Sequence, residues 1–206
     1  GLLTALSFYL LVGAGLFVPG IAGTTIVVER EQQSWDLLAL TQLRPASIVL
    51  GKAFSAVGMF LVMVIALFPF IGSLYFLVGV DWGQVVVSLS LVLLTAITCS
   101  FAGVACSAWV RRTPRAISAS YAAMLGVMGL PWAILAAILS FISITMFSGG
   151  PGWLGPALLL TSPFSVLTMS SIGQWATFAA VWDTFAIHVA YQLVLIVIAF
   201  FVALAG

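Results

Sequence analysis

The sequence predicts an all-α integral membrane protein, a bundle of about five transmembrane helices that forms a single transmembrane domain over residues 1–206. Its residues are 64% apolar and only 5% charged, whereas a soluble domain carries about a quarter charged residues. The charged positions also divide the chain into apolar runs that reach the roughly 20 residues an α-helix needs to cross a bilayer. These runs cover residues 2–28, 53–78, 85–110, 116–147 and 184–204.

The basic residues indicate how these spans are oriented. Because each span reverses the side of the membrane, segments 29–52 and 111–115 lie on one side, and Asp81 and segment 148–183 on the other. All six Lys and Arg residues belong to the first side: Arg30, Arg44, Lys52, Arg111, Arg112 and Arg115. Cytoplasmic loops carry such an excess. We therefore expect a multi-pass protein of the cell inner (cytoplasmic) membrane, with 29–52 and 111–115 cytoplasmic.

The external segment 148–183 is apolar but interrupted by Pro151, Pro156 and Pro163. Proline frees backbone groups that hydrocarbon cannot satisfy, so a regular spanning helix is disfavoured here. The segment instead predicts short re-entrant or interfacial helices packed on protein. An ordinary external loop is the alternative.

The cytoplasmic segment 29–52 is the one concentrated polar stretch of the sequence. Its polar residues recur at helical spacing and form one stripe, which consists of Glu29, Gln32, Gln33 and Asp36, with Trp35 and Leu38 pointing largely away from it. This pattern predicts an amphipathic helix at the membrane surface that offers one face to a water-soluble partner. A connector that touches nothing is the alternative. Pro45 then breaks the helix, and Ser47 is a candidate cap for the next span.

The same segment resembles the signature of ABC-2 type transporter permeases. The resemblance rests on Glu29-Arg30-Glu31, Trp35-Asp36-Leu37-Leu38, Leu40-Thr41, Leu43, Pro45 and Ile48-Val49-Leu50-Gly51-Lys52. In that family a span ends in Glu-Arg-Glu, a Leu-Leu pair and Thr-Pro-Leu-Ser follow, and Gly-Lys opens the next span. Gln33 and Gln42 depart from the pattern, because the family has glycine and proline there. The family has six spans, so the resemblance implies that the first is missing and that this chain is a piece lacking an N-terminal part.

The resemblance implies a permease subunit that couples ATP hydrolysis by a separate ABC ATP-binding subunit to substrate export, with a second permease half as a homo- or heterodimer partner. ATP and Mg²⁺ would bind the partner subunit, and this chain would hold no cofactor. The segment would act as a cytoplasmic coupling helix that docks on the ATP-binding subunit. Its partner-binding residues would be Glu29, Arg30, Glu31, Gln32, Gln33, Trp35, Asp36 and Leu38.

Two basic residues of the segment have simpler interpretations. Arg30 lies beside Glu29 and Glu31, so we expect local charge pairing, with contact to membrane lipid phosphate as the alternative. Lys52 is expected to extend its ammonium group to the membrane interface.

Several functions are excluded or disfavoured by what the sequence lacks. Gly51-Lys52 is not a P-loop, because Ala46 and Ala53 occupy the positions of its first glycine and its Ser or Thr. We therefore expect no ATPase or other enzyme activity from this chain. A net charge of +1 disfavours nucleic acid as a partner. A non-transporting membrane scaffold or assembly factor that docks a cytoplasmic partner remains the alternative function.

A third hypothesis, an intramembrane enzyme around His188 and Asp183, lacks a catalytic or metal-binding motif. His188 is expected to lie at the interface or to face a pore.

Helix packing also leaves a pattern within the spans. Ser118, Ala122 and Gly126 recur every four residues and predict close packing inside one subunit, with a dimer interface as the alternative. Pro131 lies inside a span and predicts a kink.

Overall fold

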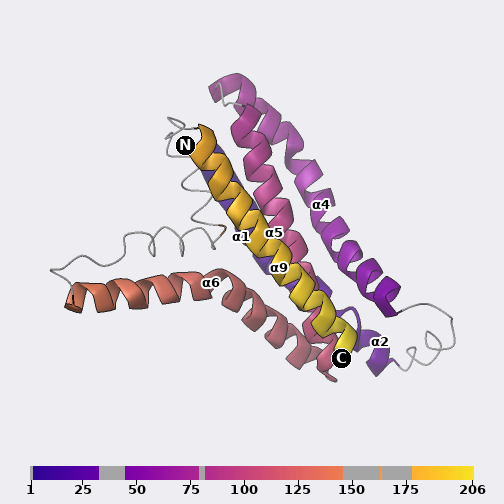
Figure 1. Ribbon diagram of the computed structural model, residues 1–206. Coiled ribbons are helices and arrows are strands. Elements are labelled where there is room, and N and C mark those ends of the chain that lie inside the picture. The colour runs from indigo at the N-terminus through magenta and orange to yellow at the C-terminus, as the bar shows by residue number, and fades with distance from the viewer. Residues whose placement is uncertain (1, 33–44, 79–81, 146–162, 164–177) are drawn as a thin grey trace.

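The computed structural model describes residues 2–32, 45–78, 82–145, 163 and 178–206, and every regular element in these ranges is an α-helix (Figure 1). The all-α prediction is therefore confirmed for the part of the chain that is described. The helices are α1 (Leu2–Thr24), α2 (Val27–Glu31), α4 (Pro45–Val78), α5 (Trp82–Trp109), α6 (Thr113–Thr145) and α9 (Phe178–Ala205).

Four stretches are long and apolar enough to cross a membrane: Ala5–Glu31, Pro45–Phe70, Val85–Trp109 and Phe185–Ala205. They correspond to α1 with α2, α4, α5 and α9. The predicted span 116–147 falls on α6, whose side chains are described only up to Gly129, so that span stays a prediction. Most of segment 148–183, with its predicted short helices, lies outside the described residues.

α5 is the inner helix of the bundle. It packs against α1, α4, α6 and α9, and 61% of its spanning stretch is buried, compared with 56% in α1 with α2, 28% in α4 and 17% in α9. Figure 1 shows α1, α4, α5 and α9 running side by side, whereas α6 bends near its middle and its second half leaves the bundle. Pro131 lies near the middle of α6, where the sequence predicts a kink.

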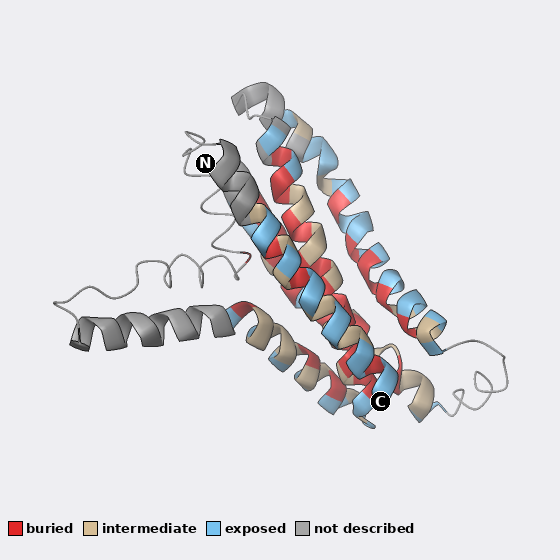
Figure 2. Ribbon diagram, viewed as in Figure 1, coloured by how far each residue is buried: buried red, intermediate tan, exposed pale blue. Residues whose placement is uncertain are grey.

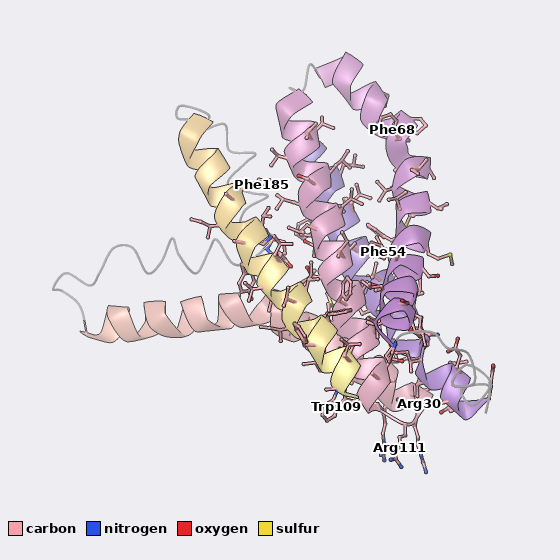
Figure 3. All side chains as sticks on the ribbon, turned by 45° about the vertical axis from the view of Figure 1, so that its right-hand side comes forward. Arg30, Phe54, Phe68, Trp109, Arg111 and Phe185 are labelled. Atoms are coloured by element: carbon pink, nitrogen blue, oxygen red, sulfur yellow. The ribbon has the colours of Figure 1, made fainter. Side chains whose placement is uncertain are left out.

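Figure 2 shows long rows of exposed positions on α4 and α9, and many of these positions carry large apolar side chains. Phe54 and Phe68, labelled in Figure 3, are 60% and 56% exposed, and Phe201 on α9 is equally exposed. A soluble monomer rarely presents contiguous apolar surface on this scale. The faces are suited to lipid, and the chain is a membrane-embedded helical protein.

Glycines allow α1 to approach its neighbours closely. A Cβ atom on Gly20 would lie 2.8 Å from the hydroxyl oxygen of Tyr121, and one on Gly23 would overlap Ser120, both on α6. A Cβ atom on Gly103 of α5 would lie 2.7 Å from the Cβ atom of Ala22. Such contacts of small residues are the usual means by which membrane helices pack tightly.

The small-residue stripe predicted on α6 does not form this contact. Ser118 and Ala122 are exposed, and among the described residues no atom outside the backbone of α6 itself lies within 4 Å of a Cβ atom built on Gly126. The prediction that the stripe packs inside the subunit is wrong, because α6 turns another face, with Ser120 and Met128 buried, toward the glycines of α1. Large side chains fill the space that those glycines leave.

The start of α4 also differs from the sequence prediction. α4 begins at Pro45, whose fixed φ suits the first turn of a helix. Ser47, expected as a cap, therefore lies within the helix.

Candidate functional site at the basic end

The candidate site lies where α2, α5, α6 and α9 meet, at the end of the bundle that carries Arg30, Lys52, Arg111, Arg112 and Arg115, which we call the basic end. Figure 3 places Arg30, Trp109 and Arg111 there, with Phe68 and Phe185 toward the other end. The chain reaches this end through a break between α1 and α2. The hydroxyl of Thr25 donates to the carbonyl of Ala22 at 2.8 Å, so the last turn of α1 is closed by its own side chains.

The start of α2 is capped by another helix. The backbone N–H groups of Ile26 and Val27 donate to the hydroxyl oxygen of Ser107 on α5, at 3.1 and 3.0 Å. Ser107 is fully buried. The first N–H groups of a helix have no partner within it, so this serine satisfies them and fixes α2 on α5.

Glu29 connects α2 to α4. Its Oε1 atom lies 2.7 Å from the Nζ atom of Lys52, and this ammonium group also donates to the carbonyl of Thr25 at 2.8 Å. The side chain of Lys52 is only 15% exposed. The ammonium group of Lys52 is therefore held by a carboxylate and a carbonyl of the break between α1 and α2, and its extension to the membrane interface stays a prediction.

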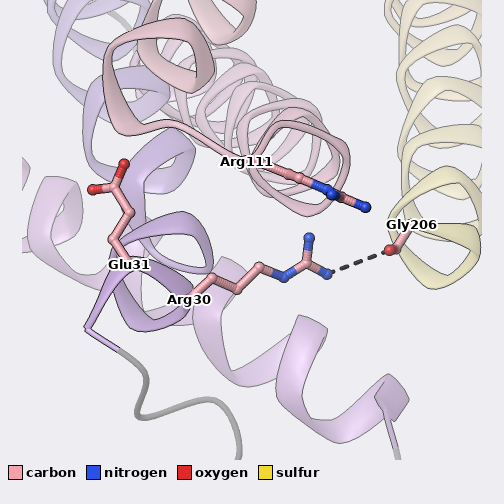
Figure 4. Close-up of a pocket in the computed structure, with 4 residues that line it drawn as sticks. All are labelled: Arg30, Glu31, Arg111 and Gly206. Atoms are coloured by element: carbon pink, nitrogen blue, oxygen red, sulfur yellow. Dashed lines mark hydrogen bonds between the residues drawn. The ribbon is translucent and has the colours of Figure 1, made fainter.

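Arg30 connects α2 to α5 and α9. Its guanidinium group donates to the carbonyl of Ala108 at 2.7 Å and to the carbonyl of Gly206 at 3.3 Å. The last carbonyls of a helix lack partners within it and carry partial negative charge. Arg30 therefore binds the last turn of α5 and the residue that follows α9, and Figure 4 marks the second of these contacts with a dashed line. These two carbonyls are far away in the sequence, and the pairing of Arg30 with Glu29 and Glu31 stays a prediction.

Glu31 connects α2 to α6. Its carboxylate accepts hydrogen bonds from the backbone N–H of Thr113, at 2.8 Å, and from the Thr113 hydroxyl. Thr113 is the first residue of α6. A carboxylate at a helix N-terminus satisfies an unpaired donor and interacts favourably with the helix dipole.

The three consecutive residues Glu29, Arg30 and Glu31, which we call the charged cluster, thus contact four other helices: Glu29 binds Lys52 of α4, Arg30 binds Ala108 of α5 and Gly206 after α9, and Glu31 binds Thr113 of α6. The geometry follows from the α-helix, in which successive side chains point about 100° apart. Neighbouring residues therefore face different partners, and α2 becomes the junction of α4, α5, α6 and α9.

The other candidate residues are placed less fully. Gln32 is exposed, and its backbone N–H donates to the carbonyl of Val28 at 3.0 Å. Gln33, Trp35, Asp36 and Leu38 lie outside the described residues. Partner binding by these residues, and by the charged cluster, stays a prediction.

His188 lies in a separate polar group between α9 and α5. Its Nε2 atom is 3.3 Å from the Nε2 atom of Gln192, and the Oε1 atom of Gln192 accepts a hydrogen bond from the hydroxyl of Thr98 on α5. His188 and Gln192 are fully buried. His188 therefore faces the neighbouring helix rather than the interface. Within the described ranges, no three His, Cys, Asp or Glu residues come together as metal ligands.

The fold and the site define a membrane-embedded all-helical protein whose polar contacts concentrate at one end. Comparison of the chain with known protein families and with curated proteins finds no match.

Proposed function

We propose that this chain is a permease subunit of an ABC-2 type transporter. A separate subunit would hydrolyse ATP, and two membrane halves would move the substrate out across the membrane. The proposal is supported by the pattern of residues 29–52 and, most of all, by the position of the charged cluster, which precedes segment 33–44 and contacts four helices.

The contacts suit a coupling role for segment 33–44. This segment joins α2 to α4, and the ion pair between Glu29 and Lys52 links those two helices directly across its base. A displacement of the segment would move α2 and α4 together. Arg30 and Glu31 would pass that displacement to the ends of α5, α9 and α6. A docked ATP-binding subunit would thus act on the whole bundle through one short helix.

The test is to co-express the full-length protein with a P-loop ATPase encoded beside it and to measure both co-purification and ATPase activity. Trp35→Ala and Asp36→Ala are expected to abolish the complex, because these residues would contact the partner. Glu31→Ala is expected to weaken the complex less than these two substitutions, because the Glu31 carboxylate is also bound by Thr113 of α6, and to reduce the coupling of ATPase activity to the membrane subunit. Arg115→Gln, at the same end but outside the contacts described above, is the matched control.

The outcomes distinguish the transporter from a scaffold. An unchanged complex with both Trp35→Ala and Asp36→Ala would refute docking through segment 33–44. A complex that forms normally while the ATPase rate is the same with and without the membrane subunit would favour a non-transporting scaffold. ATP-dependent export of a candidate substrate, measured in vesicles that contain the complex, would then be the deciding measurement.

A further inference from the structure

A proline lies inside α1 and weakens that helix. Pro19 has no backbone N–H, so the carbonyl of Gly15 lacks the hydrogen bond that a regular helix would give it, and the proline ring crowds that carbonyl. Gly15 and Gly20 lie on either side of the weakened turn, and glycine stabilises a helix less than alanine does. α1 therefore bends most easily between residues 15 and 20.

The hydrophobic core divides at the same level. Ala14 and Val18 belong to one cluster, which α6 joins through Met128, whereas Ala22 belongs to a second cluster that reaches the basic end. The residues of α1 on the two sides of Pro19 thus pack in different clusters. A bend at Pro19 changes the angle between two packed units and does not need to open either of them.

The hydroxyl of Tyr121 on α6 bonds to α1 at this weakened turn. It donates to the carbonyl of Leu16 at 2.7 Å. A Cβ atom on Gly20 would lie 2.8 Å from the same hydroxyl oxygen, so the hydroxyl approaches the backbone of α1 through the space that this glycine leaves. In membrane proteins, neighbouring helices supply partners for backbone groups near a proline. Tyr121 therefore joins α6 to the weakest part of α1.

The other side chains of α6 beside this turn are adaptable. A Cβ atom on Gly15 would overlap Met124 and would lie 3.6 Å from the Sδ atom of Met128. Residues 121, 124 and 128 are spaced by three and four positions and so share one face of α6. Methionine has a flexible, unbranched side chain that accommodates changes of shape. Of these three side chains, that of Tyr121 makes the directional bond, which favours one angle of α1.

We propose that α1 contains a hinge at Pro19 and Gly20 and that the Tyr121 hydroxyl is the latch that holds this hinge at one angle. Release of the latch lets the segment of α1 before Pro19 tilt relative to the segment that leads into α2. The second segment is anchored, because Ser107 of α5 caps the start of α2. The hinge is a property of this chain alone and does not depend on the proposed transport function.

The experiment measures the distance between two spin labels on the full-length protein in lipid nanodiscs. One label replaces Tyr9, before the hinge, and the other replaces Phe54, on the part of α4 that packs in the second cluster; these side chains are 73% and 60% exposed. Cys99 and Cys106 are replaced by alanine so that the labels attach only at the chosen positions. The parental chain is expected to show one main distance. Tyr121→Phe is expected to raise the population of a second distance about fivefold, the size of one lost hydrogen bond.

Two further variants distinguish a hinge from a general loss of packing. Pro19→Ala restores the backbone N–H of residue 19, so its addition to Tyr121→Phe is expected to remove the second distance. Ser118→Ala is the matched control, because the Ser118 hydroxyl lies on the same helix as Tyr121 but donates to the Arg115 carbonyl of that helix. It should leave the parental distances unchanged.

Either of two results would overturn the hinge. Identical distances in Tyr121→Phe and the parental chain would mean that the hydroxyl does not hold the angle of α1. A second distance that persists after Pro19→Ala is added would place the movement elsewhere than at Pro19. If Tyr121→Phe lowers the unfolding temperature, Pro19→Ala alone decides the question. It is expected to narrow the parental distance distribution, and an unchanged width would also overturn the hinge.

Discussion

The Nζ atom of Lys52 lies 2.7 Å from the Oε1 atom of Glu29, and this ion pair joins α4 to α2 across the base of segment 33–44. The two side chains are 15% and 32% exposed, which places the pair between a surface salt bridge and a buried one. Lys52 also closes the break between α1 and α2 through the Thr25 carbonyl. The pair therefore fixes three helices at the basic end.

Removal of one partner should destabilise this junction. Lys52→Met is expected to lower the free energy of unfolding by about 1–2 kcal/mol, because it leaves a partly buried carboxylate without its cation. The measurement is denaturant unfolding of the full-length protein in mixed micelles. Glu29→Gln combined with Lys52→Met should recover part of the loss. Strict additivity of the two substitutions would mean that the side chains do not interact.

Glu31 should control the start of α6. Glu31→Ala removes both acceptors that Thr113 uses, so the first amides of α6 are expected to exchange hydrogen severalfold faster, while those of α5 stay unchanged. Gln32→Ala changes an exposed neighbour and should leave α6 as it is. Uniformly faster exchange in all helices after Glu31→Ala would indicate general destabilisation instead of the loss of a cap.

Hydropathy and charge placement predicted the helical class and most helix positions, because long apolar runs have few other ways to satisfy their backbone in a membrane. They did not predict the partners of the charged cluster. Arg30 binds the carbonyls of Ala108 and Gly206, which are far away in the sequence. The sequence does indicate that partners exist, because three charged residues directly after an apolar run need them. Which residues become the partners depends on how the helices assemble.

The packing faces illustrate the same limit. The stripe of Ser118 and Ala122 has the spacing of a close contact, yet α6 packs through Ser120, which lies opposite Gly23. Spacing identifies where a helix could approach closely. Which stripe is used depends on complementarity with the neighbouring helix, and here the glycines of α1 accept larger residues of α6.

The contact between Gly103 and Ala22 gives a test of that packing. Gly103→Ala is expected to destabilise the protein by about 1–3 kcal/mol, because the added methyl group meets the Ala22 side chain and forces α1 and α5 apart. Gly58→Ala on α4 is the matched control, since nothing lies within 4 Å of its added methyl group. That control should be neutral or slightly stabilising. Equal effects of the two substitutions on the unfolding midpoint would contradict the close approach of α1 and α5.

The hydrogen bond from Thr98 to Gln192 should hold α9 against α5. Thr98→Val keeps the shape of the side chain but removes the hydroxyl that bonds to the Gln192 side chain and to the Leu94 carbonyl of its own helix, so a loss of about 1 kcal/mol is expected from the contact with Gln192, the usual size of a polar contact between membrane helices. Thr95→Val is the control, because Thr95 is equally buried on α5 but donates to the Leu91 carbonyl of its own helix. Most of the rest of the α9 surface is exposed. The two substitutions are therefore compared by how readily α9 is released from the bundle, measured by cross-linking or by limited proteolysis. Release should rise with Thr98→Val and stay at the parental level with Thr95→Val. No rise with Thr98→Val would assign the attachment of α9 to its apolar contacts and not to this polar group.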